Sequence, residues 1–445
     1  MGRVPWDLPA LALDPPGFLV RRATRRGPIA PVRLGRRSVY VVAGPEQVQQ
    51  VLTQQHAFPK GMAHDPSTPE PGPPLALALG NGLLSSSGGH HARQRRLMQP
   101  SFSHTAVAGY AERMLEAAEG LAASWSDGDS VDLTAALSEV TLHILTRTVF
   151  DTPLPESDIR AIRWAVTHGQ PLAGVRGLVR TRNREGVARL MPQVAAAMAP
   201  ARAVISRLAA ERAGGEPRED LLSLLQAAVD AETGERMSAQ DVEDEVLTLL
   251  LAGHETTTNA LSWTFALLAR HPLAAYRLHE EVDAAYAQGR RPTGVELTAL
   301  PWTSACVDEA MRLYPPAWLI LRHTDQPARI GIVDVPAGST LVVSPFATHR
   351  IPALWPDPDR FEPERFAPGG AAHPARRRPL TAYLPFGGGP RLCIGEHFAL
   401  LEARIVLAVI ARDWFVHPVG ARFPAYKPRI TLGPKGGLTA VVTRR

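Results

Sequence analysis

Apolar residues recur at helical intervals through most of the first two thirds of the chain, from about residue 46 to residue 302. Glycine and proline clusters, as at residues 214–217, divide this region into separate helices. Before it, apolar and polar positions alternate over residues 32–42, which predicts a short hairpin around Gly35. We therefore expect a helix-rich chain that opens with a small pair of strands.

The pattern changes after residue 319. Short β-like segments with many prolines follow, and a stretch rich in glycine, proline and arginine leads to a last strong helix over residues 396–412. The C-terminus is predicted to form a hairpin that turns at residues 433–437. We expect a mainly α fold with a small β-rich portion, forming one domain over residues 1–445. The expected β-rich segments lie near residues 31–43, 328–343 and 429–442.

The longest predicted helix runs from about residue 239 to residue 270, which is ~45 Å at ~1.5 Å per residue. Ser238 and Asp241 form a capping-box pattern at its start, and Pro272 follows its end. The helix is apolar nearly all round over residues 246–252, which predicts that it is buried.

The middle of this helix departs from the rules for a helix interior. Gly253 and the threonines that follow weaken a helix, and Glu255 places a carboxylate in a buried stretch. Such a departure indicates a functional site. His254-Glu255 is similar to the start of a zinc-peptidase helix, but that motif needs a second histidine where this chain has Thr258, so it is excluded.

The composition bounds the class of protein. The chain has 445 residues, of which 45% are hydrophobic and 20% charged, and this excludes a disordered chain, a collagen and a coiled coil. No apolar run approaches the ~18–20 residues that a membrane helix needs. Prolines interrupt the first 20 residues, where a signal peptide would need an apolar block. We expect a cytoplasmic protein without an integral membrane segment.

The net charge is +5, and all but three of the 48 basic residues are arginines. Genomic base composition explains this bias, and a basic docking face for an acidic partner is the sharper alternative. There is no zinc finger, basic zipper or aromatic–basic repeat, so we expect no nucleic-acid partner.

The two cysteines lie in different surroundings. Cys393 lies in the glycine-rich segment 386–395, just before a helix whose N-terminal dipole would stabilise a thiolate. A phosphate-binding loop is a weak alternative there, because no Lys-Ser/Thr pair follows the glycines. Cys306 lies in an amphipathic segment without glycine, which is typical of a packed core cysteine.

The segment from Phe386 through Arg391 and Cys393 to Gly395 resembles the haem-binding loop of the cytochrome P450 superfamily. Three further segments resemble P450 motifs in the family's order. They are residues 252–256 (the oxygen-binding groove), 309–312 (Glu-x-x-Arg) and 363–366 (the third member of the Glu–Arg–Arg network). The resemblance implies the P450 fold in a single haem domain, haem b as cofactor, O2 as co-substrate and the activity of a soluble bacterial monooxygenase.

The resemblance also implies roles in holding the haem. Cys393 would be the thiolate ligand of the iron, Phe386 would cover the haem near the sulfur, and Gly395 would complete the loop. The propionates need cations, and Arg391 and Arg322 are candidates.

Two further groups would support the haem. The family usually has Trp at the position of His91, four residues before the basic Arg95. His91 can still donate a hydrogen bond to a propionate. Glu309 and Arg312, together with Arg365, would form a buried ion-pair network that holds the cysteine loop.

Glu255 and Thr256 match the acid–alcohol pair that relays protons to dioxygen. No flavin or iron–sulfur segment is present, so electrons would come from a ferredoxin-type donor with its reductase, for which Arg93 and Arg96 are candidate docking charges. Near the iron, four apolar residues would face the substrate: Leu249, Ala252, Leu319 and Ile320.

The substrate is expected to be apolar. Parts of the chain resemble bacterial carotenoid-ring hydroxylases, so ring hydroxylation of a β-ring carotenoid is the leading hypothesis, and a fatty acid or terpenoid is the alternative. A carotenoid would enter end-on through an apolar channel formed by residues 60–83 and 164–201, and the protein could touch a membrane surface peripherally to reach it. The candidate channel residues are Leu75, Leu77, Leu79, Trp164, Val166, Leu172 and Val175.

Two rival functions share the same fold. A peroxide-driven peroxygenase would not need the retained Glu255-Thr256 pair, because peroxide already supplies protons and electrons. In a haem-based gas sensor without turnover, the same relay would be idle. Reductant-dependent product formation separates the three hypotheses.

Overall fold

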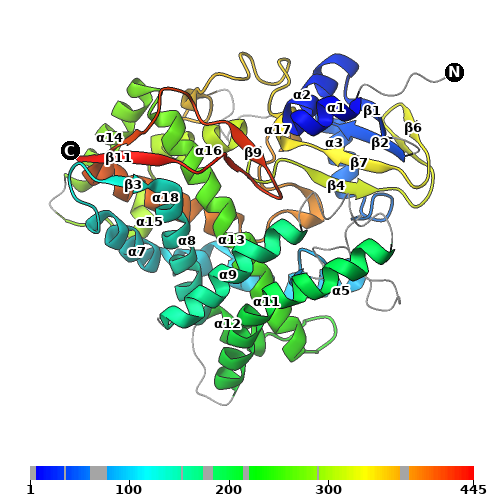
Figure 1. The fold of residues 1–445 in the computed structure, drawn as a ribbon, viewed down its shortest axis with the longest axis horizontal. Helices are drawn as coiled ribbons and strands as arrows, with labels where there is room; N and C mark the ends of the chain where they lie inside the picture. Colours follow the sequence, from blue (N-terminus) through cyan, green and yellow to red (C-terminus); the bar gives the residue numbers. More distant parts are fainter. Residues whose placement is uncertain are drawn as a thin grey trace.

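A computed structural model describes residues 7–34, 37–60, 78–151, 154–173, 184–213, 220–287, 290–370 and 380–445. Helices make up most of it, and small sheets lie at two opposite ends (Figure 1). The N-terminal segment lies beside the largest sheet, and the C-terminus lies at the far end of the molecule (Figure 1). The structure is therefore mainly α with small sheets, as the sequence predicts.

The helices share the apolar spacing that the sequence shows. They are α1 (Asp7–Leu13), α2 (Pro15–Arg26), α3 (Pro45–Thr53), α5 (Gly88–Met98), α6 (His104–Ala108), α7 (Ala111–Ala123), α8 (Leu133–Phe150), α9 (Glu156–Ala173), α11 (Arg184–Ala213), α12 (Leu221–Ala227), α13 (Ala239–Leu268), α14 (Pro272–Tyr286), α15 (Gly294–Thr298), α16 (Pro301–Leu313), α17 (Pro345–Thr348) and α18 (Glu396–Asp413).

A four-stranded sheet has the order β1-β2-β7-β4. Strands β1 (Ile29–Leu34) and β2 (Arg37–Val42) form the hairpin that the alternation predicts, with Leu34 opposite Arg37. β7 (Thr340–Val343) pairs in parallel with β2, and β4 (Ile320–His323) pairs antiparallel with β7. β5 (Ala328–Ile330) and β6 (Val333–Val335) form a separate hairpin.

The predicted C-terminal hairpin is wrong in its pairing. β10 (Leu432–Pro434) pairs with β9 (Tyr426–Pro428), while β11 (Thr439–Arg444) joins a second sheet between β3 (Ser130–Asp132) and β8 (Trp414–Pro418). The glycines near residue 436 thus connect two different sheets. Alternation identified the strands, but their partners lie far away in sequence.

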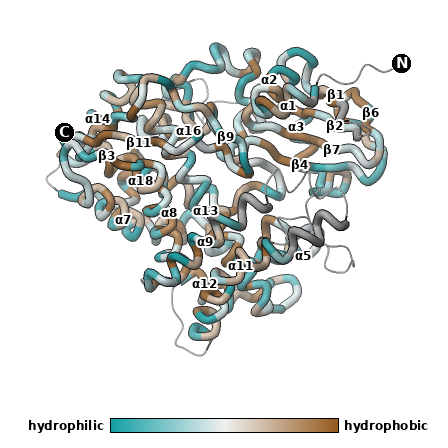
Figure 2. Tube along the Cα trace, viewed as in Figure 1, coloured by the Kyte–Doolittle hydropathy of each residue, from teal (hydrophilic) through white to brown (hydrophobic). Residues whose placement is uncertain are grey.

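α13 runs through the centre of the helical region and contacts α8, α11, α16 and α18 (Figure 1). Its 30 residues begin with the predicted capping box between Ser238 and Asp241. Most of its side chains are buried from Val246 to Leu268, which agrees with its all-round apolar pattern. Figure 2 shows that hydrophobic segments gather along the sheet strands and central helices, while the outer turns are hydrophilic.

Candidate active site

The cysteine loop is a tight turn placed directly before α18. The Cys393 N–H donates to the Phe386 carbonyl at 3.0 Å, which closes the loop. Gly387 and Gly389 adopt φ values of +79° and +68°, in the left-handed region that favours glycine. A Cβ on Gly389 would also lie 2.5 Å from the Leu52 carbonyl oxygen, so the loop packs against the end of α3 only with glycine there.

The Cys393 thiol lies in a recess. Its surface is accessible to solvent, yet burial raises its pKa to about 11, although a hydrogen bond from the Gly395 backbone and the Arg95 charge oppose the rise. The two observations agree if the sulfur faces a space that is enclosed by protein atoms. An accessible thiol in such a space can bind a metal ion, which displaces the thiol proton.

Four cations gather near this loop: Lys60, Arg95, Arg322 and Arg391. Burial, with repulsion from Arg391 and Arg322, lowers the pKa of Lys60 to about 7. Burial also lowers the pKa of Arg322 and Arg391 to about 10 each, and for Arg391 the charges of Arg322 and Arg95 add to the effect. Like charges held this closely in a desolvated place need an anion.

The described residues supply no such anion. None of their carboxylates forms an ion pair with these four cations, and the Arg391 Nη1 atom is buried without a hydrogen-bond partner among them. Arg95 donates to the Leu392 carbonyl at 2.6 Å and Arg322 to the Leu321 carbonyl at 2.9 Å. The cluster therefore fits a ligand that carries carboxylates beside the thiol.

His91 belongs to the same cluster. It is buried, and burial together with the Arg391 and Arg95 charges lowers its pKa to about 3. The imidazole is therefore neutral at physiological pH, with one ring N–H to donate and no charge. It can thus offer the single hydrogen bond that the sequence comparison expects from this position.

Sequence reasoning missed Lys60. It is one of only three lysines in an arginine-rich chain, but no local pattern connects it with the loop. Its Nζ donates to the Leu84 carbonyl, which ties it to the segment before α5. Only the fold brings residue 60 next to Arg391.

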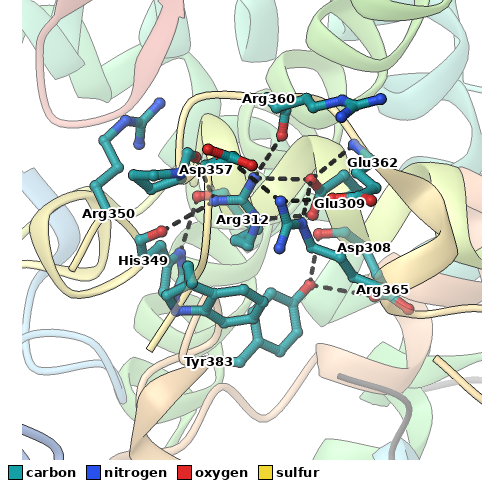
Figure 3. A network of polar contacts seen from close by, with 12 residues as sticks. Asp308, Glu309, Arg312, His349, Arg350, Asp357, Arg360, Glu362, Arg365 and Tyr383 are labelled. Carbon is teal, nitrogen blue, oxygen red and sulfur yellow. Dashed lines mark hydrogen bonds and ion pairs between the residues drawn. The ribbon is translucent and has the colours of Figure 1, made fainter. Parts of the chain in front are cut away.

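The Glu309, Arg312 and Arg365 side chains meet in a buried network, as predicted (Figure 3). Arg312 binds the Glu309 carboxylate through two hydrogen bonds of 2.7 Å each. The Arg365 Nε atom lies 3.5 Å from Glu309 Oε1, and the Glu362 N–H donates to the same oxygen at 2.9 Å. Burial raises the pKa of the Glu309 carboxyl, and the paired Arg312 opposes that rise.

The network extends to the cysteine loop through His349 and Tyr383 (Figure 3). His349 Nε2 accepts from the Leu384 N–H at 2.9 Å, so its Nδ1–H donates to the Arg312 carbonyl at 3.0 Å. Burial lowers the pKa of His349 to about 3, which keeps it in this neutral form. Tyr383 donates to the Asp308 carbonyl at 2.9 Å. Residues 383–384, just before the loop, are thus fixed to α16.

The other side of the site is a stripe on α13. Leu249, Ala252, Gly253 and Thr256 are partly exposed, at helical spacing, on a helix that is otherwise mostly buried. Thr256 donates to the Ala252 carbonyl at 2.9 Å, which leaves its oxygen lone pairs free. A Cβ on Gly253 would lie 3.0 Å from a Leu145 methyl group, so glycine lets α8 pack closely here.

Glu255 points toward the C-terminal strands. Its Oε1 accepts from the Thr431 hydroxyl at 2.8 Å, and its Oε2 is buried without a partner among the described residues. The helix stays continuous through residues 252–258 despite its weak helix formers. The acid and the alcohol are therefore adjacent on one regular helix.

The predicted substrate-facing residues come from two elements. Leu249 and Ala252 lie on the α13 stripe, while Leu319 and Ile320 lie at the start of β4, all partly exposed. The Ile320 Cδ1 atom lies 3.6 Å from the position of a Cβ on Gly387, so β4 reaches the cysteine loop.

Most of the predicted carotenoid channel lies outside the described residues. Among the candidates that the structure describes, Leu79 is buried and Trp164 is half-exposed, with its ring stacked on His168. The candidates whose positions or side chains lie outside the description are Leu75, Leu77, Val166, Leu172 and Val175.

Cys306 is fully buried in α16, and burial raises its pKa well above the ordinary value, as expected for a packed thiol. Arg93 and Arg96 are different from the prediction. Arg96 forms two hydrogen bonds with the buried Asp230 (3.0 and 2.8 Å), and Arg93 pairs with Glu235 at 3.5 Å. Both arginines are used within the fold, so they are not free docking charges.

The described residues contain no group of three or more His, Cys, Asp or Glu side chains that could hold a metal ion. No described helix has the length and apolarity needed to cross a membrane. A metal would therefore need a single protein thiolate and a bound cofactor. Haem b fits: the thiol recess suits the iron, and the acid-free cation cluster suits the two propionates.

Comparison with known proteins agrees with this geometry. The family model "Cytochrome P450" matches residues 11–438, and the chain belongs to the cytochrome P450 family, whose members are monooxygenases with haem b. In the solved cytochrome P450DA heme domain the fold recurs with a TM-score of 0.83 and 26% identity, covering 97% of this chain and 93% of that one.

Three curated relatives are similar over nearly the whole chain. Cyclooctatin synthase of Streptomyces melanosporofaciens is 37% identical over 92% of this chain and 87% of its own length. Cyclooctat-9-en-7-ol 5-monooxygenase of the same organism is 34% identical, covering 88% and 83%. Pentalenene oxygenase of Streptomyces avermitilis is 33% identical, covering 88% and 84%.

Proposed function

We propose that this P450 monooxygenase hydroxylates a cyclic terpenoid, with Cys393 as the iron ligand. The observation that carries the assignment of the ligand is the accessible Cys393 thiol, which lies in a recess beside a cation cluster without carboxylates. When bound, haem supplies an iron centre that activates dioxygen. We further propose that the whole chain forms one haem domain.

Each group of residues then has a distinct task. Arg95, Arg322, Arg391 and Lys60 neutralise the propionates, and the neutral His91 donates a hydrogen bond to them. Phe386 and Gly395 bound the loop around the sulfur. The Glu309 network holds residues 383–384, and thereby the loop, in place.

On the opposite side, residues of α13 handle substrate and protons. Leu249 and Ala252, with Leu319 and Ile320, present aliphatic surface and exclude water. Thr256, whose proton is held by the Ala252 carbonyl, keeps lone pairs free to accept a hydrogen bond in the groove. Glu255 supplies protons from behind.

The terpenoid assignment rests on the relatives and on the lining. The three relatives above oxidise terpenoids. Those lining residues of the stripe and of β4 that the structure describes carry no charge and no aromatic ring, which suits an aliphatic polycyclic substrate. Carotenoid ring hydroxylation, the leading hypothesis from the sequence, finds no support among these relatives.

A spectral binding screen tests the substrate class. We expect a polycyclic terpene hydrocarbon to shift the haem spin state at lower concentration than a β-ring carotenoid or a fatty acid. Incubation with reductant, ferredoxin, reductase and oxygen should then yield a product heavier by one oxygen atom. A carotenoid or fatty acid that binds more tightly than every terpene tested, and is hydroxylated, would refute the terpenoid assignment.

We propose a ferredoxin-type donor with its reductase as the electron source, and the cytoplasm as the location. The absence of a flavin or iron–sulfur segment from the sequence supports a separate donor. Because Arg93 and Arg96 are paired internally, the docking face has to be sought elsewhere on the surface. Peroxide-driven turnover without a donor, faster than turnover with reductant, would favour the peroxygenase.

Thr256→Ala is expected to uncouple turnover. The variant should bind haem and substrate normally, because the hydroxyl is bonded only to carbonyls of its own helix. The product formed per reductant should fall at least about tenfold, less than the ~10²-fold of a full general acid because water replaces part of the hydroxyl's role. Thr258→Val, which removes a buried hydroxyl two residues away, should keep the parent ratio. A parent ratio in Thr256→Ala would contradict the relay role.

Lys60 offers a pH test of the propionate site. Its pKa of about 7 in the cation cluster lies below the ordinary 10.5, whereas two bound carboxylates would favour the charged form. The apoprotein must therefore take up a proton at Lys60 when it binds haem above pH ~7. By linkage, its affinity for haem falls as the pH rises from about 7 toward 10.

Haem titration of the apoprotein at several pH values measures this dependence. Lys60→Met should weaken it, while Lys427→Met, which changes an exposed lysine, should leave it unchanged. Equal pH slopes in the parent and in Lys60→Met would show that Lys60 does not face the propionates.

A further inference from the structure

One stripe of α13 is bound to the strand β10 and the residue before it. Glu255, Asn259 and Trp263 are spaced four residues apart, so they lie one above another on the same face of the helix. Each makes a hydrogen bond to residue 431 or 432. This stripe is distinct from the one at Leu249, Ala252 and Thr256 that faces the recess.

The hydrogen bonds assign the direction of the Thr431 proton. The Asn259 Nδ2 atom donates to Thr431 Oγ1 at 3.1 Å, so the hydroxyl oxygen is the acceptor in that pair. The hydroxyl proton is then free to point to Glu255 Oε1, 2.8 Å away. Thr431 thus receives from an amide and donates to a carboxylate, as a charge-assisted donor should.

The consequence for Glu255 is an asymmetric carboxylate. Oε1 is held by Thr431, while Oε2 is buried and has no partner among the described residues. A carboxylate with one oxygen fixed has a defined orientation, and its other oxygen remains available to give or accept a proton. A side chain held in this way can deliver protons from one place only.

The strand itself is well anchored. The Trp263 Nε1–H donates to the Leu432 carbonyl at 2.9 Å, and the Leu432 N–H donates to the Pro316 carbonyl at 3.0 Å. A Cβ on Gly433 would lie 2.4 Å from Asn259 Oδ1, so glycine allows the close approach of β10 to α13. Thr431 therefore acts from a rigid support.

We propose that Thr431 is a positioning residue for proton delivery, which fixes the Glu255 carboxylate and is itself oriented by Asn259. This deepens the proposed relay through Glu255 and Thr256 and does not depend on the substrate class. Thr431 acts through Glu255 and does not touch the reacting atoms.

The test compares three variants in the haem-loaded protein with a ferredoxin, its reductase and oxygen. Thr431→Val removes the hydroxyl at nearly constant volume, and Thr431→Ser retains it. Trp263→Phe removes a different hydrogen bond to the same strand and leaves Glu255 and Thr431 bonded. Measurements are the hydrogen peroxide released per reductant and the solvent deuterium isotope effect on oxygen consumption, both of which can be made without a known substrate.

We expect Thr431→Val to raise the peroxide released per reductant roughly three- to tenfold, below the ~10²-fold cost of a 1 Å misplacement, and to enlarge the solvent isotope effect. Thr431→Ser should stay within about twofold of the parent. Trp263→Phe should speed amide hydrogen exchange over residues 429–434 while keeping the parent peroxide ratio. Where a substrate is known, peroxide-driven product formation should be unchanged in all three, because peroxide brings its own protons.

The same peroxide ratio in Trp263→Phe and Thr431→Val would overturn the proposal, since the effect would then come from the support of the strand. So would a parent ratio in Thr431→Val. If Thr431→Val fails to fold, Thr431→Cys decides, because a thiol is a weak donor of similar size. A parent ratio in that variant overturns the proposal, and a raised ratio supports it. Failure of every terpene to bind would refute the substrate class and leave these readouts unaffected.

Discussion

We expect Cys393→Ser to abolish the strongly red-shifted Soret band that the reduced carbon monoxide complex of a thiolate–haem shows. A serine hydroxyl does not ionise at neutral pH and is a poor ligand for iron, so the thiolate cannot be replaced. The loop itself should survive, because the Cys393 N–H bond to the Phe386 carbonyl involves only backbone. Protein that still binds haem should then show a shorter-wavelength band.

Cys306→Ser is the matched control. That thiol is buried in α16, so the variant should lose some stability, about 1–3 kcal/mol for a buried hydroxyl without a partner, and keep the red-shifted band. Recording carbon monoxide difference spectra of both variants at equal haem content measures the effect. A red-shifted band in Cys393→Ser would refute the ligand assignment.

Glu309→Gln is expected to prevent normal haem loading. The carboxylate accepts both hydrogen bonds from Arg312 and one from the Glu362 N–H. An amide can neutralise neither Arg312 nor Arg365, which remain buried with uncompensated charge. Removing one partner of such a pair costs about 3–5 kcal/mol, against a total stability of about 5–15 kcal/mol for a folded protein.

The loss reaches the haem through His349, since the Arg312 carbonyl positions the imidazole that holds the Leu384 N–H. We therefore expect haem content per protein to fall by at least about tenfold, with a lower melting temperature. Glu156→Gln, which breaks the exposed pair with Arg160 at 3.7 Å, should change stability by less than about 1 kcal/mol. The ratio of Soret to protein absorbance and thermal unfolding distinguish the two. Parent haem content in Glu309→Gln would show that the network does not support the loop.

Local patterns were enough for the long helix and for the chemistry of the motifs. The capping box at Ser238 and Asp241, the buried face of α13 and the glycines before α18 depend on neighbours within a few residues, so periodicity and spacing reveal them. The contrast between Cys393 and Cys306 also followed from their local surroundings.

Contacts between distant segments were beyond such patterns. Lys60, His349 and Thr431 became candidates only when the fold brought them to Arg391, Leu384 and Glu255, each more than 30 residues away. The internal pairing of Arg93 and Arg96 with residues 230–235 also required the fold.

The sequence alone determined the family, the thiol, the acid–alcohol pair and the helical class, because each depends on residue types at short, fixed spacing. The tertiary structure decided which cations converge without an anion, which strands pair at the C-terminus and which hydroxyl holds Glu255. Those features depend on how elements far apart in sequence pack together, and the free energy of that packing comes from buried surface and hydrogen bonds that no local window contains.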